Sequence, residues 1–209
     1  MLNQYLERLK IAARTLKDGG VVIIATETFY CMAADPFVGE AVDRIFELKS
    51  RSYDKPLPLI ASSVERVWAV ISEESRDAFE LACRFWPGSL TMLMNLNLSF
   101  PACLTGSGGR VGVRVPTDCP ASELAAMGSG WITATSANLA GGPNASEIEQ
   151  IPAALLNSVD FVVDTGPTPG GLPSTVMALE GGLPVIHRNG AVSMEAISHA
   201  LGLEIDKST

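Results

Sequence analysis

The feature that most constrains the fold is a continuous apolar run at residues 21–25, Val-Val-Ile-Ile-Ala, directly after a pair of glycines. Apolar residues at every position, rather than at alternate ones, are typical of a strand buried on both faces of a sheet. Before this run, apolar residues recur at helical spacing from Leu2 to Leu16, and Gly19 and Gly20 are typical of a helix end. The chain is therefore expected to be an α/β protein.

Helical and strand patterns continue along the rest of the chain. The expected elements are helices at residues 40–50, 63–71, 73–85, 120–127, 148–156 and 193–201, and strands at residues 57–60, 91–96, 111–116, 131–135, 161–164, 174–179 and 184–188. Pro58 predicts an edge position or a bulge for its strand. Ser193 is a plausible helix cap, and residues 180–182, Glu-Gly-Gly, predict a hairpin. Since no long linker or repeat interrupts the pattern, residues 1–209 are expected to form a single α/β domain with a mixed sheet.

Charge and cysteine usage exclude several function classes. The net charge of −8 argues against a protein that coats nucleic acid, so any cationic site must be local. The four cysteines show no CxxC spacing, which indicates reduced thiols, and the two histidines lie far from any cysteine pair, which argues against zinc. The N-terminus does not resemble a signal peptide, and no apolar run has the length of a membrane span. We expect a cytoplasmic protein with no membrane association.

Three cations, Lys49, Arg51 and Lys55, fall together at the end of an expected helix and in the connection after it. Lys49 also continues the apolar face of that helix. Lys and Arg in a last turn complement the helix dipole, but three convergent cations also suit a polyphosphate. Further polar groups follow other elements, and ligands of open α/β sheets gather at strand ends. These groups are Thr26–Thr28, Arg110–Arg114, Ser136–Asn138, and Ser174 with Arg188.

Any one of these groups has a simple explanation, because Ser, Thr and Asn favour turns. Together, cationic and hydroxyl-bearing groups in an acidic chain favour a shared anionic ligand. The sequence has no Walker A, GxGxxG or HExxH motif, and no Cys/His or Ser/His/Asp arrangement for covalent catalysis. Such a site predicts phosphoryl or nucleotidyl transfer, in which positioning and charge neutralisation do most of the catalysis.

Several short motifs follow one another along most of the chain. They are Thr26-Glu27-Thr28-x-Tyr30, Lys49-x-Arg51-x-x-x-Lys55-Pro56-Leu57, Trp86-Pro87-Gly88-x-Leu90-Thr91, Val113-Arg114-Val115-Pro116, Thr135-Ser136-Ala137-Asn138-Leu139-x-Gly141, Ser174-Thr175-Val176 and Arg188-x-Gly190. In this order they resemble the threonylcarbamoyl-AMP synthase family (YrdC/TsaC-like), in its short single-domain form. The resemblance implies a twisted mixed sheet flanked by helices, with a concave cationic cavity.

The activity that this resemblance implies is the formation of threonylcarbamoyl-AMP and pyrophosphate from L-threonine, bicarbonate or CO2, and ATP. A tRNA threonylcarbamoyl transferase is the implied partner, with tRNA binding weak or indirect. Mg2+ is expected to accompany ATP, without dedicated protein ligands. Two alternatives stay open: a nucleotide-binding paralogue with another acceptor or hydrolytic activity, and a non-enzymatic RNA-binding module.

The resemblance also implies roles for individual residues. Lys49 and Arg51 match catalytic cations. The positions expected to bind ATP are Arg51, Lys55, Arg110, Ser136, Asn138, Asn144 and Arg188, and those expected to bind threonine are Thr28, Ile60, Arg114, Ala134 and Ser174. The chain departs from the family pattern at Cys31, where glycine is usual. The cysteine either narrows the pocket or is a tolerated small side chain.

Overall fold

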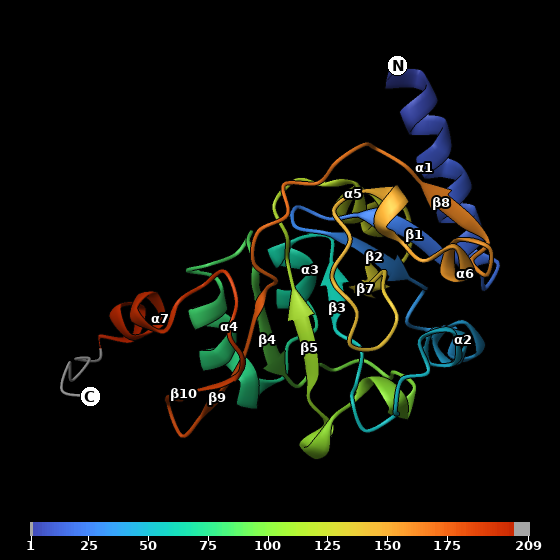
Figure 1. Cartoon of the computed structure of the whole chain (residues 1–209). Coiled ribbons are helices and arrows are strands. Elements are labelled where there is room, and N and C mark those ends of the chain that lie inside the picture. The colour runs from blue at the N-terminus through green and yellow to red at the C-terminus, as the bar shows by residue number, and fades with distance from the viewer. Residues whose placement is uncertain (1, 203–209) are drawn as a thin grey trace.

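The structure is a computed structural model that describes residues 2–202. Its strands form two mixed sheets flanked by helices (Figure 1). The four-stranded sheet has the order β7-β2-β1-β8, and the six-stranded sheet has the order β10-β9-β4-β5-β3-β6. The strands are β1 (Val22–Ala25), β2 (Tyr30–Ala33), β3 (Leu59–Ala61), β4 (Leu90–Met94), β5 (Val111–Arg114), β6 (Trp131–Thr133), β7 (Thr135–Ser136), β8 (Phe161–Val163), β9 (Thr175–Glu180) and β10 (Leu183–Arg188).

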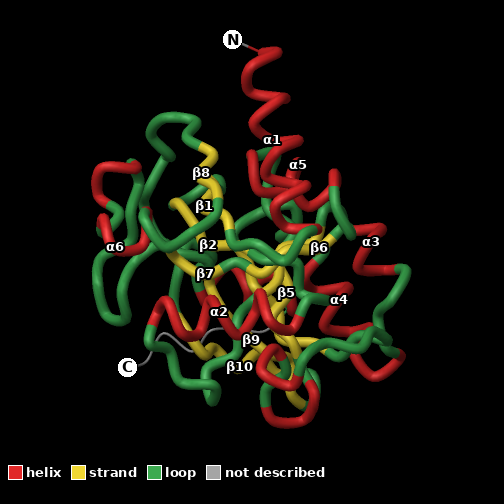
Figure 2. The backbone as a smooth tube through the Cα atoms, turned by 90° about the vertical axis from the view of Figure 1, so that its right-hand side faces the viewer, coloured by secondary structure: helices red, strands yellow, loops and turns green. Residues whose placement is uncertain are grey.

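Helices lie around these sheets. They are α1 (Leu2–Lys17), α2 (Gly39–Lys49), α3 (Val64–Trp68), α4 (Arg76–Ala82), α5 (Pro120–Met127), α6 (Ala153–Leu156) and α7 (Met194–Leu201), with short 3-10 turns η1 (Glu73–Ser75), η2 (Ala102–Leu104), η3 (Ser107–Gly109) and η4 (Ile148–Gln150). Helix α4 packs on β4 and β9, and α5 contacts β1, β3 and β6. The N-terminal end of α1 extends beyond the rest of the fold (Figures 1 and 2). Among the described residues, no helix is long and apolar enough to cross a membrane.

Strand β1 explains why the first apolar run is continuous. All of its residues are buried. Ile23 belongs to one apolar cluster with residues of α2 and β4, whereas Val22 and Ile24 belong to a second cluster with residues of α1 and α5. Alternate side chains of a strand point to opposite faces of the sheet, so each face of β1 fills a separate core. The expectation of a strand buried on both faces is confirmed.

The α/β class, with twisted mixed sheets flanked by helices, is confirmed, but the strands divide between two sheets. Strand β2 was not expected: a turn reverses the chain after β1, and residues 30–33 then pair antiparallel with β1. The strand expected at residues 131–135 is interrupted at Ala134. Residues before it, in β6, pair with β3, and residues after it, in β7, pair with β2. The chain therefore passes from one sheet to the other at Ala134.

Three further expectations are wrong in detail. Strand β3 lies between β5 and β6 rather than at an edge, and Pro58 precedes it. The helix expected at residues 148–156 is interrupted because Pro152 has no N–H to donate, so η4 and α6 form instead. The helix expected at residues 73–85 begins with η1 and its α-helical part ends at Ala82. By contrast, the bounds of α5, the β9–β10 hairpin and the cap of α7 by Ser193 are confirmed.

Candidate active site

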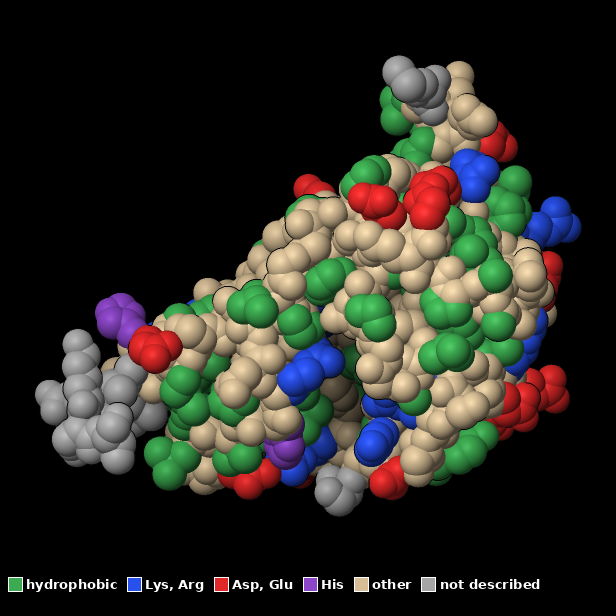
Figure 3. Space-filling view, in the orientation of Figure 1, with side chains coloured by type: hydrophobic (Ala, Val, Ile, Leu, Met, Phe, Trp, Pro, Cys, Tyr) green, Lys and Arg blue, Asp and Glu red, His purple; other side chains and the backbone are tan. Residues whose placement is uncertain are grey.

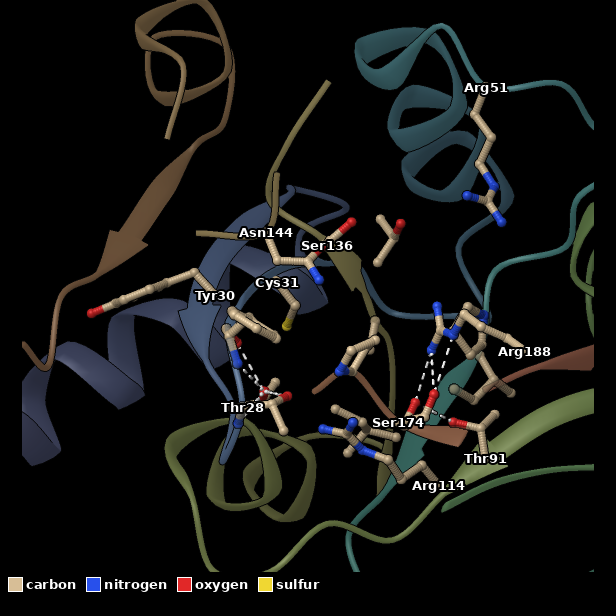
Figure 4. A pocket seen from close by; sticks show the side chains of 18 residues that line it. Thr28, Tyr30, Cys31, Arg51, Thr91, Arg114, Ser136, Asn144, Ser174 and Arg188 are labelled. Carbon is tan, nitrogen blue, oxygen red and sulfur yellow. Dashed lines mark hydrogen bonds between the residues drawn. The ribbon is translucent and has the colours of Figure 1, made fainter. Parts of the chain in front are cut away.

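A pocket lies where the two sheets meet, and both sheets contribute to it. Figure 3 shows Lys and Arg side chains on both sides of a hollow in this face of the molecule, and Figure 4 shows the pocket from close by. The lining residues are Thr26, Thr28, Phe29, Tyr30, Cys31, Arg51, Pro58, Leu59, Ile60, Thr91, Arg114, Ala134, Thr135, Ser136, Asn144, Pro173, Ser174 and Arg188.

The structure brings together most of the residues selected from the sequence. Those that line the pocket are Thr28, Arg51, Ile60, Arg114, Ala134, Ser136, Asn144, Ser174 and Arg188. The other four, Lys49, Lys55, Arg110 and Asn138, are outside its lining. Their roles stay predictions, as do the roles of the lining residues. The pocket itself shows that side chains more than a hundred positions apart in sequence reach one place.

Lys49 is the last residue of α2 and is only 3 % exposed. Its ammonium group donates to the backbone carbonyl of Ser136, to the carbonyl of Asn138 at 2.8 Å and to the Asn138 side-chain oxygen at 2.9 Å. An ammonium group has three N–H donors, so all of them are used within the protein. Burial lowers the pKa of Lys49 to about 8, and the nearby charge of Arg51 acts in the same direction.

The segment that Lys49 contacts shapes one wall of the pocket. The Ser136 hydroxyl donates to the Asn138 side-chain oxygen at 2.6 Å, and the Asn138 amide donates to the carbonyl of Gly142 at 2.6 Å. The Lys49 side chain therefore joins the end of α2 to the segment that carries Ser136. The sequence grouped Ser136 with Asn138, and the structure shows that Lys49 donates hydrogen bonds to both.

Arg51 follows α2 through a left-handed residue, Ser50, with φ at +47°. Its Nε donates to the carbonyl of Lys55 at 2.6 Å and its Nη2 to the carbonyl of Pro56 at 3.1 Å. Burial lowers the pKa of the Arg51 guanidinium. These contacts hold the guanidinium in the pocket, whereas Lys55 is exposed at the surface.

Arg188, at the end of β10, contacts the residue that precedes β9. Its Nε and Nη2 donate to the Ser174 carbonyl at 3.2 and 2.9 Å, and Nη2 also donates to the Ser174 hydroxyl at 3.0 Å (Figure 4). The Ser174 hydroxyl also lies 2.9 Å from that of Thr91. Partial burial lowers the pKa of Arg188, and the positive charges of Arg114 and Arg51 lower it further. The guanidinium groups of Arg114 and Arg51 are thus close enough to Arg188 to repel it.

Arg114 ends β5 and is 8 % exposed. Its Nη2 donates to Glu27 Oε2 at 2.7 Å, and the two side chains are 10 % and 13 % exposed. Within the described residues, its Nε is buried without a hydrogen-bond partner. Arg110, at the other end of this strand, donates to Glu180 Oε1 at 3.0 and 3.1 Å, away from the pocket lining.

Cys31, the departure from the family pattern, belongs to β2 and pairs with Ile24 and Ser136. Its backbone is extended, so a side chain is accommodated without strain at this position. The thiol is 5 % exposed and lines the pocket. Burial raises its pKa to about 12, so at neutral pH it is a protonated and unreactive part of the wall.

The lining residues do not provide a metal centre. Among the described residues, no group of three or more His, Cys, Asp and Glu side chains could hold a metal ion, and the lining contains arginines and hydroxyl groups but neither Asp nor Glu. Guanidinium groups and hydroxyl donors suit phosphate and carboxylate oxygens instead. The arrangement is chemically suited to anionic ligands.

The fold and the pocket together define an α/β protein in which two mixed sheets meet at a pocket lined by three arginines and by hydroxyl-bearing side chains. The chain belongs to the Sua5/YciO/YrdC family, since the model of that family, described as telomere recombination, matches residues 14–190.

Named relatives share most of the chain. A threonylcarbamoyl-AMP synthase of Pyrococcus abyssi is 33% identical over 93% of this chain and 57% of its own length. The threonylcarbamoyl-AMP synthase of Bacillus subtilis is 32% identical over 94% of this chain and 57% of its own length. The crystal structure of P. abyssi Sua5 complexed with L-threonine superposes with a TM-score of 0.85 at 34% identity, over 93% of this chain and 57% of that one. The chain thus spans little more than half the length of these relatives.

Proposed function

We propose that this chain forms threonylcarbamoyl-AMP and pyrophosphate from L-threonine, bicarbonate or CO2, and ATP. The observation that carries the proposal is the convergence of Arg51, Arg114 and Arg188 on one pocket whose lining residues include no carboxylate. This reaction brings together a triphosphate, a carboxylate and a carbamate, so it needs a site that binds several anionic groups at once. The similarity to relatives named threonylcarbamoyl-AMP synthase supports the same activity.

L-Threonine is proposed to bind at the end of β5. The Arg114 guanidinium is suited to the amino-acid carboxylate, because Nε lacks a partner among the described residues. Thr28 and Ser174 supply hydroxyl groups to the same pocket, and Ile60 and Ala134 supply a small apolar wall for the side-chain methyl group. The relative crystallised with L-threonine supports this class of substrate.

ATP is proposed to lie across the other side of the pocket. Arg51 and Arg188 would bind phosphate oxygens, and Ser136 and Asn144 would contact the nucleotide. Lys49 would act through the segment that it holds, with Asn138 as its partner. Lys55 and Arg110 lie outside the lining, so they would reach only a part of ATP that extends beyond the pocket. We propose that Mg2+ arrives bound to ATP, since the described residues offer it no set of side-chain ligands.

The chemistry needs positioning more than a protein nucleophile. The threonine amine adds to CO2 and loses a proton, which gives a carbamate. A carbamate oxygen then attacks the α-phosphorus, the bond to the β-phosphate oxygen breaks, and pyrophosphate leaves with the electron pair. Arg51 and Arg188 are placed to neutralise charge on the phosphates during this step, which is how fixed cations accelerate nucleotidyl transfer.

The product implies a partner and a compartment. We propose that a tRNA threonylcarbamoyl transferase accepts the threonylcarbamoyl group, since an acyl-adenylate is an activated donor. We also propose a cytoplasmic location, because all four cysteines of the chain are free thiols, as in a reducing compartment.

The test is pyrophosphate release from ATP with L-threonine and bicarbonate, repeated with each component left out and with L-serine in place of threonine. We expect release that needs all three substrates and is faster with threonine. Release that ignores threonine would point to a hydrolytic paralogue. Binding of tRNA without ATP turnover would point to the RNA-binding alternative.

A further inference from the structure

Glu27 is an acidic residue that contacts one of the pocket's arginines, Arg114, without lining the pocket. It lies in the turn between β1 and β2, next to Thr28, and its side chain is 13 % exposed. One carboxylate oxygen accepts from Arg114 Nη2 at 2.7 Å, and the other accepts from the Ser89 hydroxyl at 3.2 Å. The carboxylate therefore has fixed partners on two sides.

The turn that carries Glu27 is itself fixed. The Thr26 hydroxyl oxygen accepts from the backbone N–H groups of Thr28 and Phe29 at 3.1 and 3.2 Å, and the hydroxyl donates to the Phe29 carbonyl at 2.8 Å. Such side-chain bonds to the local backbone hold a turn in one conformation. Glu27 consequently approaches Arg114 from a rigid support rather than from a free loop.

The ion pair leaves part of the Arg114 guanidinium available. Nη2 is engaged by Glu27, whereas Nε is buried and has no partner among the described residues. A buried donor without a partner is costly, so this group favours an anionic acceptor. With Glu27 in place, the guanidinium is held in one orientation, in which Nε is the donor left for a carboxylate.

The contact of Glu27 with the Ser89 hydroxyl also connects Glu27 to the segment that carries Ser174. The Ser89 carbonyl accepts a hydrogen bond at 3.0 Å from the backbone N–H of Thr175, the residue directly after Ser174. Glu27 is thus connected on one side to Arg114 and on the other to the segment of Ser174. Both of these residues belong to the proposed threonine subsite.

We propose that Glu27 is the positioning residue of the threonine subsite: it orients Arg114 for the amino-acid carboxylate and, through Ser89, supports the segment of Ser174. The inference rests on the proposed function. It predicts that Glu27 governs recognition of the carboxylate and not binding of ATP, since Arg51 and Arg188 do not contact Glu27 in the described hydrogen bonds.

The experiment measures L-threonine, L-threoninamide and ATP binding by calorimetry in the wild type, Glu27→Ala and Glu27→Gln. Threoninamide keeps the amine and side chain but lacks the carboxylate charge. We expect Glu27→Ala to weaken threonine binding by about tenfold, as for the loss of one charge-assisted contact. Threoninamide and ATP binding should change little. Gln keeps an acceptor oxygen for Arg114, so Glu27→Gln should retain part of the threonine affinity.

Three further variants separate positioning from general stability. Arg114→Gln and the double variant with Glu27→Ala complete a double-mutant cycle, and residues that act as a unit give non-additive losses. Asp160→Asn is the matched control, because it removes the negative charge that pairs with Arg44 at 2.5 Å, outside the pocket lining. It should lower the melting temperature without altering threonine affinity.

Each outcome either supports the role of Glu27 or overturns it. Unchanged threonine affinity in Glu27→Ala overturns the inference, and so do additive losses in the cycle. Equal losses for threonine, threoninamide and ATP also overturn it, since they indicate a structural role alone. If the wild type binds ATP but not threonine, the proposed function fails and the inference fails with it.

Discussion

Arg188 and Ser174 are joined by three hydrogen bonds, two to the Ser174 carbonyl and one to its hydroxyl, across the pocket end of the β9–β10 hairpin. One residue is proposed to contact ATP and the other L-threonine. The two substrate subsites are therefore linked by direct contact, so a change in Arg188 is expected to affect both substrates.

Arg188→Lys tests this link. A lysine keeps the charge but cannot reproduce the planar fork that reaches two atoms of Ser174. We expect KM to rise for both ATP and threonine, by about tenfold each. Steady-state kinetics with each substrate varied in turn gives the two values. His187→Gln, at the exposed neighbouring position, is the control, and an effect of Arg188→Lys confined to one substrate would contradict the link.

Arg51→Ala tests the phosphate side of the pocket. Loss of a well-placed cation that neutralises developing charge costs about a hundredfold or more in rate. We expect pyrophosphate release to fall by that factor. The melting temperature should change little, because the bonds that Arg51 makes are to carbonyls of its own loop. Arg76→Ala, on α4 and beside Trp68, should retain the wild-type rate. Wild-type turnover by Arg51→Ala would remove this residue from the catalytic set.

The pH dependence of ATP binding is expected to reflect deprotonation of the Lys49 ammonium group. Burial lowers the pKa of this residue to about 8, so its ammonium group loses a proton as pH rises through that value. A neutral amine has only two N–H donors, so one of the three contacts with Ser136 and Asn138 is lost. ATP affinity, measured without threonine, should therefore decline above about pH 8. Lys49→Met should bind ATP weakly at every pH, without this decline.

The free energy of unfolding should also depend on pH through Lys49, but it should increase over the range in which ATP affinity decreases. The pKa of this lysine is about 8 in the folded protein against 10.5 as the ordinary value. Between these values the unfolded chain binds more protons than the folded one, so this residue raises the free energy of unfolding as pH increases. Denaturant titrations across that range should show the increase in the wild type. A slope that is equally positive in Lys49→Met would have another origin.

Substitutions of Cys31 are expected to change the size of the pocket. Cys31→Leu adds bulk to the wall beside Ser136 and should raise KM for threonine. Cys31→Gly should lower the melting temperature, since glycine in a strand costs roughly 0.5–1 kcal/mol, while substrate affinity is retained. Kinetics and thermal melts on the same preparations separate these effects. Cys83→Ala, outside the pocket lining, is the control. If Cys31→Leu binds threonine normally, Cys31 does not limit the pocket.

The local features of the fold could be predicted from the sequence because they depend on neighbouring residues. Strand β1 follows from its apolar run, and the bounds of α5 follow from Pro120 and the helical pattern after it. Strand β2 could not be predicted in the same way, because four residues after a polar turn carry too little pattern. The break at Ala134 also depends on which strands pair, and pairing is a long-range property.

In the candidate site, too, contacts between residues far apart in the sequence could not be predicted. The sequence placed Lys49 on the apolar face of α2, and this position indicated burial. Its partners lie 87 and 89 residues further along the chain, so these contacts could not be predicted from the sequence around Lys49. Glu27 and Thr91 stood within recognised motifs, but no residue nearby in sequence reveals their contacts with Arg114 and Ser174.

The passage of the chain between sheets at Ala134 has a mechanical consequence. Thr28 and Ser136 belong to or border the four-stranded sheet, and Arg114, Ser174 and Arg188 belong to or border the six-stranded sheet, so a molecule that spans the pocket would contact both sheets. A reactant bound across the pocket would therefore restrain the two sheets relative to each other. Hydrogen exchange of β6 and β7 should slow when both reactants are present.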